Sequence, residues 1–374
     1  MIVGIDGNEA NIKERVGVHQ YAFEIIWALY KLQDIKSEGI QFIVYLKKPP
    51  MSDLPKENDY WKYKVIHGGS LWVIKKLTPY LYSNKQLDVF FTPSHYLPLV
   101  FGLPKICTIH DLGYLKFSEQ FKKYDFWQLK YWSAISIYIS KYIICPSNAT
   151  ATDLVRHYNF ASKKCRVVYH GYDRDKFNPD IERNFVRQIQ NKYRIDKKYL
   201  LFLSTLKPSK NIEGLIDAFS IVSKKYSVNL VIAGKKGWLY DSIFEKVNKL
   251  GLKDKIIFTG YVPDEDKPGL IKGSRAFILP SFWEGFGMDI LHAMACGTPV
   301  VVSKVASMPE VAGNAGLYID PYNITSIVKA LEKVLNINDR EYNKISKLSQ
   351  IQARKFSWKM AGKETLKVIK EGTR

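Results

Sequence analysis

The chain has 374 residues, of which 46% are hydrophobic, and a net charge of +20 from 56 basic and 36 acidic residues. This length is enough for two domains with separate cores, and no run is long and apolar enough to span a bilayer. The four cysteines are scattered without a CxxC pair, which excludes a zinc-ribbon pattern and favours reduced thiols in a cytoplasmic protein over a disulfide framework. The charge favours anionic partners, such as nucleotide diphosphates, an anionic membrane or nucleic acid, but a lysine-rich solvated surface explains it equally well.

Strands and helices alternate through the first half of the chain. The opening residues MIVGIDGNEA predict a strand over residues 1–6 and a loop, and not a signal peptide. Apolar spacing predicts a helix over residues 19–32, with Gly17 at the junction of loop and helix. Further elements are expected at residues 41–46, 62–66, 72–82, 87–91, 106–111, 118–141, 142–147, 148–158 and 166–170.

The segment ICTIHD, residues 106–111, is a predicted strand with a polar end. In doubly wound sheets, ligands bind beyond the carboxyl ends of the strands. His110 and Asp111 are therefore candidate site residues. The alternative is a capping aspartate beside a core histidine.

Residues 118–141 predict one long helix with Ser118 as its N-cap. Its lysines include Lys122, Lys123 and Lys130, and its rings include Tyr124, Trp127, Tyr131 and Tyr138. Aromatic rings beside lysines suit the headgroup region of a membrane. We therefore expect any membrane contact to use this stretch and to be lost when Lys122, Lys123 and Lys130 are replaced by glutamate. A core helix with one solvated face is the alternative.

The second half opens with a charged helix and again alternates. Strands are expected at residues 199–204, 230–234, 255–260, 277–279 and 299–302, and helices up to residue 271 and at residues 288–295 and 357–369. In STLKPSKN, residues 204–211, a strand end leads to Lys210 ahead of an amphipathic helix, where a lysine acts as a point charge for a diphosphate. We expect Lys210→Ala to weaken diphosphate binding with little effect on folding, and Lys207 to supply a further charge. Ser307 to Glu310 fits a capping box.

Residues 280–303, PSFWEGFGMDILHAMACGTPVVVS, combine a strand end, a glycine loop, a short helix, a turn and a buried strand. Gly285 and Gly287 let the backbone approach a ligand closely. The helix that follows would direct free N–H groups and its dipole at a phosphate. Glu284, just ahead of this loop, suits the hydroxyls of a sugar.

The segment EGFGMDILHAMACGTPVVVS resembles the signature of the retaining nucleotide-sugar glycosyltransferases known as family 4 or group 1, which have an E-x7-E motif and two Rossmann-like domains facing a cleft, the GT-B fold. Glu284 matches the first glutamate of the motif. His292 stands where the second belongs, and Asp289 stands where a proline is usual. The resemblance covers almost the whole chain and is most specific over residues 204–320.

The resemblance implies an α/β protein with two doubly wound parallel sheets. Residues 1–175 would form an acceptor-side domain, residues 176–354 a donor domain, and the helix of residues 355–374 would pack back on the first. It implies Glu284 and His110 at the reacting sugar, Lys210, Gly17, Phe286 and Gly287 at the donor diphosphate, and Gly285, His292, Val262 and Asp111 at the donor sugar or nucleoside. We expect Glu284 to affect turnover and His292 to affect donor binding, and His292→Glu to keep activity.

The implied reaction moves a hexose from a nucleoside diphosphate sugar to a hydroxyl acceptor with retained configuration, without a metal, in polysaccharide or glycolipid assembly. The segment TLKPSKN most resembles bacterial mannosyltransferases, so GDP-mannose is preferred as donor over a UDP-sugar or an ADP-sugar. The acceptor would be a saccharide or a lipid-linked saccharide. The protein would be cytoplasmic, or peripheral at the inner face of the membrane on an anionic surface.

Two other classes of function stay open. The first is a sugar-nucleotide-binding protein of the same fold that has lost catalysis, which the residues at positions 289 and 292 support. The second is a nucleic-acid-binding protein. It rests mainly on the charge and lacks a recognisable motif, so no nucleic-acid partner is expected.

Overall fold

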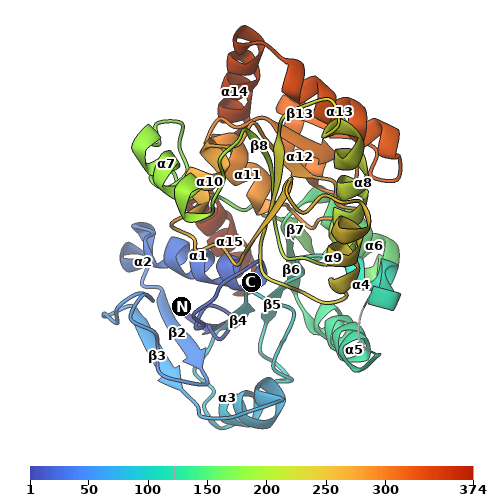
Figure 1. Cartoon of the computed structure of the whole chain (residues 1–374). Helices are drawn as coiled ribbons and strands as arrows, with labels where there is room; N and C mark the ends of the chain where they lie inside the picture. The colour runs from blue at the N-terminus through green and yellow to red at the C-terminus, as the bar shows by residue number, and fades with distance from the viewer. Residues whose placement is uncertain (121–122, 374) are drawn as a thin grey trace. The chain divides into compact units, whose positions relative to one another are not determined.

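The computed structural model describes residues 1–120 and 123–373, and the chain divides into two compact units (Figure 1). The first unit contains Met1–Lys116, Phe121–Gly171 and Ser357–Arg374, and the second contains Phe117–Gln120 and Tyr172–Phe356. Among the described residues, none of the helices combines the length and the apolar content that crossing a membrane requires.

Seven parallel strands form the sheet of the first unit, in the order β3-β2-β1-β4-β5-β6-β7. They are β1 (Ile2–Asp6), β2 (Gln41–Leu46), β3 (Trp61–Val65), β4 (Val89–Thr92), β5 (Lys105–Thr108), β6 (Tyr142–Cys145) and β7 (Cys165–Val167). Every residue of β4 and β5 is buried, as expected of parallel strands with helices on both faces. The strand order reverses between β1 and β4, so the loops that follow these strands meet at a topological switch point.

The helices of the first unit cover this sheet. They are α1 (Val18–Tyr30), α2 (Asp34–Ser37), the π-helical turn η1 (Val73–Leu77), α3 (Thr78–Ser83), α4 (Gly113–Lys116), α5 (Lys123–Ile139), α6 (Asn148–His157), the 3-10 turn η3 (Asn159–Ala161) and α15 (Trp358–Thr373). The prediction of one helix from Ser118 is wrong, because Ser118–Gln120 forms a 3-10 turn and α5 begins at Lys123. A 3-10 turn closes i→i+3 bonds and provides no α-helical first turn for Ser118 to cap. Lys122 lies outside the described residues.

The last helix, α15, belongs to the first unit although almost two hundred residues separate it from the rest of that unit. Ala361, Leu366 and Ile369 join the hydrophobic core under the sheet. A Cβ placed on Gly362 would lie 3.0–3.1 Å from atoms of Ala28, so a side chain there would require one of the helices to shift slightly, and glycine allows the close approach of α15 to α1 (Figure 1). The predicted terminal helix is therefore present, and it starts and ends slightly later than expected.

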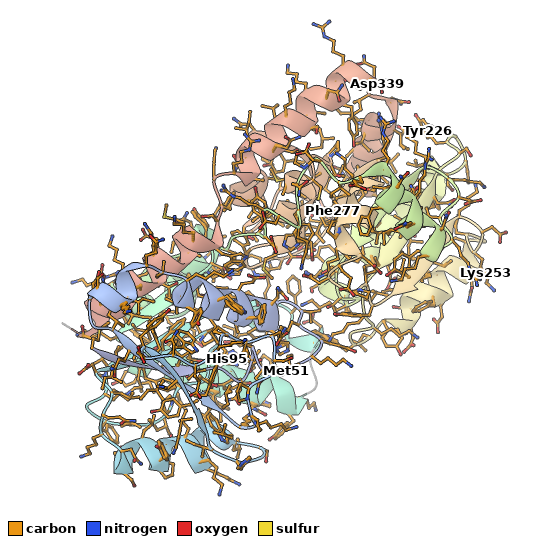
Figure 2. The ribbon with its side chains drawn as sticks, turned by 90° about the vertical axis from the view of Figure 1, so that its left-hand side faces the viewer. Met51, His95, Tyr226, Lys253, Phe277 and Asp339 are labelled. Carbon is orange, nitrogen blue, oxygen red and sulfur yellow. The ribbon has the colours of Figure 1, made fainter. Side chains whose placement is uncertain are left out.

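Six parallel strands form the sheet of the second unit, in the order β10-β9-β8-β11-β12-β13. They are β8 (Tyr199–Leu203), β9 (Asn229–Ala233), β10 (Ile256–Gly260), β11 (Ala276–Leu279), β12 (Val300–Ser303) and β13 (Gly316–Ile319). Phe277 in β11 lies in the core, whereas Lys253 and Asp339 lie at the surface (Figure 2). Here the order reverses between β8 and β11, and that pair marks the second switch point.

The helices of the second unit fill the connections between its strands. They are α7 (Arg183–Lys192), the 3-10 turn η4 (Pro208–Lys210), α8 (Ile212–Val222), α9 (Asp241–Lys249), α10 (Lys267–Lys272), α11 (Met288–Ala295), α12 (Met308–Ala312), the 3-10 turn η5 (Gly313–Ala315), α13 (Ile324–Asn336) and α14 (Asp339–Ala353). Two alternating parallel sheets confirm the predicted doubly wound, two-domain α/β class. The helices α13 and α14 were not assigned from the sequence.

Candidate active site

The second switch point brings together the two segments that the sequence singled out. Lys210 ends the turn η4 after β8, and Glu284 lies in the loop after β11. The backbone N–H of Phe282 donates a hydrogen bond of 2.9 Å to the carbonyl oxygen of Ser209, which ties the two loops to each other. The topology therefore places a cation and a carboxylate at one sheet edge.

Lys210 and Glu284 form an ion pair with little access to solvent. The Nζ atom of Lys210 lies 2.5 Å from Oε1 of Glu284, and each side chain is 11% exposed. The hydroxyl of Ser281 donates to the same Oε1 at 2.7 Å. A charged pair that is mostly removed from water interacts more strongly than a surface pair, and each partner depends on the other for its position.

The glycine loop after Glu284 leads directly into α11. Gly287 has φ 90° and ψ 57°, the left-handed region that favours glycine, and it is the residue just before the helix. The Phe286 side chain is buried and its ring contacts Phe356 with centroids 5.7 Å apart. The backbone of this loop therefore has a fixed path, and its amides precede the positive end of a helix.

Ser307 fixes the same loop from another side, which corrects a prediction. Its hydroxyl lies 2.8 Å from the carbonyl oxygen of Glu284 and 3.0 Å from that of Phe286, so it donates to the loop. Ser307 has helical φ and ψ and makes no side-chain cap bond to α12. The predicted capping box from Ser307 to Glu310 is wrong, because Ser307 has helical rather than extended backbone angles and its hydroxyl contacts a loop more than twenty residues earlier instead of a helix N–H.

His292 lies on α11 and is almost buried. Its ring stacks on Phe177 with centroids 4.0 Å apart and planes 5° from parallel. Its Nδ1 lies 3.7 Å from Oδ1 of Asp289, one turn earlier on the helix. Burial would raise the pKa of Asp289, but the interaction with His292 and the charges of Lys267 and Lys210 lower it overall. The two residues that depart from the family pattern therefore form a contacting pair.

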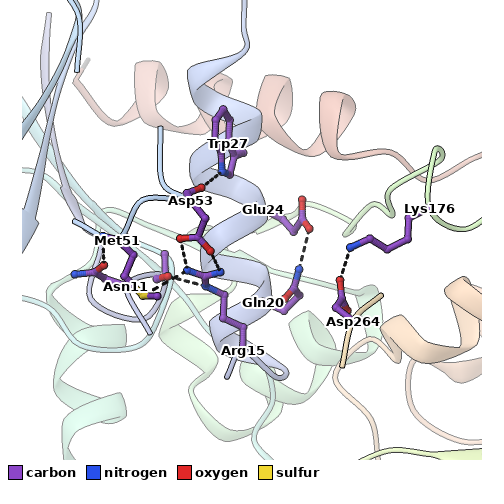
Figure 3. A network of polar contacts seen from close by, with 10 residues as sticks. Asn11, Arg15, Gln20, Glu24, Trp27, Met51, Asp53, Lys176 and Asp264 are labelled. Atoms are coloured by element: carbon purple, nitrogen blue, oxygen red, sulfur yellow. Dashed lines mark hydrogen bonds and ion pairs between the residues drawn. The ribbon is translucent and has the colours of Figure 1, made fainter. Parts of the chain in front are cut away.

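A chain of alternating charges continues from this pair. Asp264 accepts from Lys176 at 2.6 Å and from Lys267 at 2.9 Å (the first contact is drawn in Figure 3). Burial raises the pKa of Asp264, but the two lysines hold it well below its usual range. Lys267 also has a raised pKa, because the carboxylates of Asp264 and Asp289 outweigh its burial. Sequence reasoning missed Lys176 and Lys267. The one local indication of these contacts was the acidic residue Asp264, two residues beyond the predicted site residue Val262.

Val262 itself is part of the hydrophobic core, with 2% of its surface exposed. Its side chain cannot contact a nucleoside without leaving that core. A role for this position in donor binding would use the main chain of the loop after β10.

We predict that the pairing of positions 289 and 292 determines donor binding. His292→Ala should raise the donor KM about three- to tenfold, the value of one ordinary hydrogen bond, with kcat little changed. His292→Glu alone would place two carboxylates side by side and should also raise KM, in contrast to the expectation from the family motif. The double change Asp289→Asn with His292→Glu should bring KM back toward the wild-type value. Steady-state kinetics with the donor varied distinguishes these outcomes, and a His292→Ala variant whose kcat falls a hundredfold would contradict the assignment.

In the first unit, His110 follows β5 and is held by a backbone contact. Its Nε2 lies 2.9 Å from the carbonyl oxygen of Pro93, so that nitrogen carries the proton. Burial lowers the pKa of His110, which favours a neutral ring with Nδ1 as an acceptor. Asp111 is exposed, and its Oδ1 accepts from the backbone N–H of Gly113 at 2.9 Å. Asp111 thus makes the capping contact that the sequence left as an alternative.

Gly17 precedes α1 with φ 54° and ψ −115°, a combination that requires glycine, although a Cβ there would meet nothing within 4 Å. The loop ahead of it is fixed by Arg15, whose guanidinium donates to both oxygens of Asp53 at 2.6 and 3.0 Å (Figure 3). The Arg15 contact lowers the pKa of Asp53 below its usual value despite partial burial. The conformation at Gly17 is therefore supported by an ordered loop.

The same loop carries a polar pair that sequence reasoning missed. Glu9 and His19 lie 2.8 Å apart, and both side chains are partly exposed. Burial would raise the pKa of Glu9. The hydrogen bond to His19, together with the electrostatic influence of His19 and His95, lowers it overall. The positions of Glu9 and His19 on either side of Gly17 were the one sequence feature that indicated this contact.

The structure thus distributes the predicted residues over two units. The second unit holds Lys210, Glu284, Gly285, Phe286, Gly287, His292 and Val262, and the first holds Gly17, His110 and Asp111. Within the second unit, the ion pair of Lys210 and Glu284, the glycine loop and α11 form one connected arrangement. It offers a cation, backbone amides and a carboxylate at the carboxyl edge of a parallel sheet, which suits a phosphorylated ligand with hydroxyl groups.

Comparison with known proteins gives independent information. The model of the family "Glycosyl transferases group 1" matches residues 185–351, and that of "Glycosyltransferase Family 4" matches residues 36–176. The chain is 28% identical over 376 residues to the O-antigen chain mannosyltransferase B of Escherichia coli, covering 95% of this chain and 96% of that protein. Its fold is similar to that of the sucrose-phosphate synthase of Thermosynechococcus elongatus, with a TM-score of 0.77 at 16% identity, covering 99% and 98% of the two chains. It is also similar to Anabaena Alr3699/HepE in complex with UDP-glucose, with a TM-score of 0.75 at 17% identity and 99% of both chains covered.

Proposed function

We propose that this chain, which is a glycosyltransferase with the two-domain GT-B fold, transfers a hexose from a nucleoside diphosphate sugar to a hydroxyl acceptor with retention of configuration. The observation that carries the proposal is the ion pair of Lys210 and Glu284 beside the glycine loop of α11. These groups match the two ends of such a donor. The cation and amides suit its diphosphate, and the carboxylate suits its sugar.

In this proposal each group acts on a separate part of the reaction. Lys210 and the amides near Phe286 and Gly287 stabilise the charge that develops on the departing diphosphate, without requiring a metal. The carboxylate of Glu284 stabilises the positive charge that develops on the sugar. His110 presents a neutral ring nitrogen to a sugar hydroxyl, and the pair of Asp289 and His292 binds the nucleoside end. Chelation with EDTA should then leave the transfer rate unchanged, and a loss of activity that Mg²⁺ or Mn²⁺ restores would overturn this part.

For the donor we propose GDP-mannose, and for the acceptor a saccharide or lipid-linked saccharide of polysaccharide assembly. The full-length similarity to an O-antigen chain mannosyltransferase supports mannose as the transferred sugar and a saccharide as the acceptor. The structurally similar Anabaena Alr3699/HepE was solved in complex with UDP-glucose, so UDP-sugars are the first alternative donors to test. We place the reaction in the cytoplasm, where free thiols such as the buried Cys107, Cys145 and Cys296 stay reduced.

Thermal-shift screening against GDP-mannose, UDP-glucose, UDP-galactose and ADP-glucose tests the donor. A ligand that binds only the folded state, present at a concentration a hundred times its Kd, stabilises the protein by about 2.7 kcal/mol. The nucleotide sugar with the correct base should therefore raise Tm by several degrees. Incubation with the selected donor then measures release of the nucleoside diphosphate with and without saccharide acceptors. A shift without any release or transfer would favour the binding protein that lacks catalysis, and no shift with any nucleotide sugar would overturn the proposal.

A further inference from the structure

The first unit carries an apolar hollow that has no part in the proposed reaction. Its volume is about 310 Å³, and Ile74, Leu99, Trp127, Tyr131 and Ile135 are among the side chains that line it. These residues come from three separate segments, the turn η1, the loop after β4 and the helix α5. The fold therefore assembles an apolar surface that no single stretch of sequence contains.

Large aromatic side chains that line this hollow are exposed. Tyr124 is 73% exposed and Tyr131 is 60% exposed. Phe101, two residues beyond the lining residue Leu99 in the loop after β4, is 91% exposed. The N–H of Phe101 donates to the hydroxyl of Tyr82 at 3.2 Å, so this loop is attached to α3. Clustered exposure of this kind is unfavourable in water and marks an interaction surface on a soluble protein. It also shows that α5 is not simply a core helix with one solvated polar face.

The segments around the hollow are mainly basic. Residues 60–87, which include η1 and α3, contain five lysines and no acidic residue, and α5 contains Lys123, Lys130 and one acidic residue, Asp125. Lys75 and Lys76 are exposed on η1, next to Ile74. Lys130 lies over the ring of Trp127, with Nζ 4.9 Å from the ring centroid. The apolar hollow is thus bordered by ammonium groups.

We propose that this surface docks on an anionic lipid bilayer, with an acyl chain entering the hollow and the lysines contacting lipid phosphates. Aromatic side chains and long lysine stems are suited to the boundary between headgroups and acyl chains. Each lysine near an anionic leaflet adds to the attraction. A second copy of the chain would bring the same positive surface against itself, which the charge disfavours. The inference stands on this surface alone and does not depend on the identity of the transferred sugar.

Cosedimentation of the full chain with phosphatidylcholine vesicles, with and without phosphatidylglycerol, tests the charges. We expect binding only to the anionic vesicles and a loss of binding at high salt. Lys75→Glu with Lys76→Glu should weaken partitioning at least about thirtyfold, since each lysine contributes about a factor of five at the membrane surface. The matched control, Lys344→Glu with Lys347→Glu on the exposed face of α14, makes the same change in net charge and should bind as the wild type does.

Fluorescence with lipids brominated on their acyl chains tests the hollow. Quenching of tryptophan fluorescence should appear with the wild type and should be smaller in Trp127→Phe. The double variant Phe101→Ser with Tyr131→Ser should partition less into anionic vesicles, while its donor-induced thermal shift stays unchanged. The proposal is overturned if the wild type does not bind anionic vesicles, or if the fluorescence of Trp127→Phe is quenched as much as that of the wild type. It is also overturned if the wild type is a dimer in light scattering that Phe101→Ser with Tyr131→Ser converts to a monomer without any vesicle binding.

Discussion

Replacing Glu284 by glutamine is expected to lower kcat about a hundredfold to a thousandfold, the effect of removing one preorganised electrostatic group from a transition state. The donor KM should change little, because a glutamine oxygen can still accept from Lys210 and Ser281 as Glu284 does. A carboxylate that stabilises charge only as the sugar departs lowers kcat and kcat/KM together when it is removed. Steady-state kinetics with the donor found by thermal shift measures both parameters.

The control for this variant is Glu245→Gln, the same chemical change on the exposed surface of α9. It should behave as the wild type does. If Glu284→Gln retained its kcat and only raised the donor KM, the carboxylate would be a ground-state binding group, and its assignment to the reacting sugar would be wrong.

Lys210→Ala is expected to cost both nucleotide affinity and stability. A charged hydrogen bond contributes about 1.5–3 kcal/mol, so affinity for the nucleoside diphosphate should fall tenfold or more. The sequence alone suggested little effect on folding, but Lys210 is the close partner of the mostly buried Glu284. Its removal leaves that carboxylate without its cation, and we expect a loss of about 1–3 kcal/mol in the free energy of unfolding.

The double variant Lys210→Met with Glu284→Gln separates the two effects. Replacing both charges by neutral groups of similar size removes the unpaired carboxylate, so stability in chemical denaturation should recover, as for other buried pairs. Affinity in titration calorimetry should remain low, because the cation is still missing. If Lys210→Ala bound the nucleoside diphosphate as tightly as the wild type, the diphosphate site would have to lie elsewhere.

Much of this arrangement was accessible from the sequence because its signals are local. The loop from Gly285 to Gly287 and the helix α11 follow from glycine, helix and strand patterns within one stretch of about twenty residues. The parallel sheets follow from short apolar runs bounded by turns. Positions such as Lys210 were predicted because a strand end followed by a helix start fixes where a side chain emerges.

The contacts that distinguish this chain were not accessible, because they join residues far apart in the sequence. Nothing near His292 indicates that Phe177 covers its ring, and nothing near Ser307 indicates that its hydroxyl is engaged by the loop after Glu284. Ser118 is not an N-cap of α5, because its neighbours fit a long helix in sequence but α5 begins at Lys123. The hollow beside Trp127 depends on two further segments, so composition suggested only part of it.

The return of α15 to the first unit has a consequence for how the protein is made. Residues of this helix complete the core of a sheet whose strands were synthesised before Gly171, so that core stays open while the whole second unit is translated. At about 5–20 residues per second, this interval lasts roughly ten to forty seconds. The unit that leaves the ribosome first therefore cannot complete its core until the last helix has emerged, and we expect its uncovered apolar face to attract chaperones during synthesis.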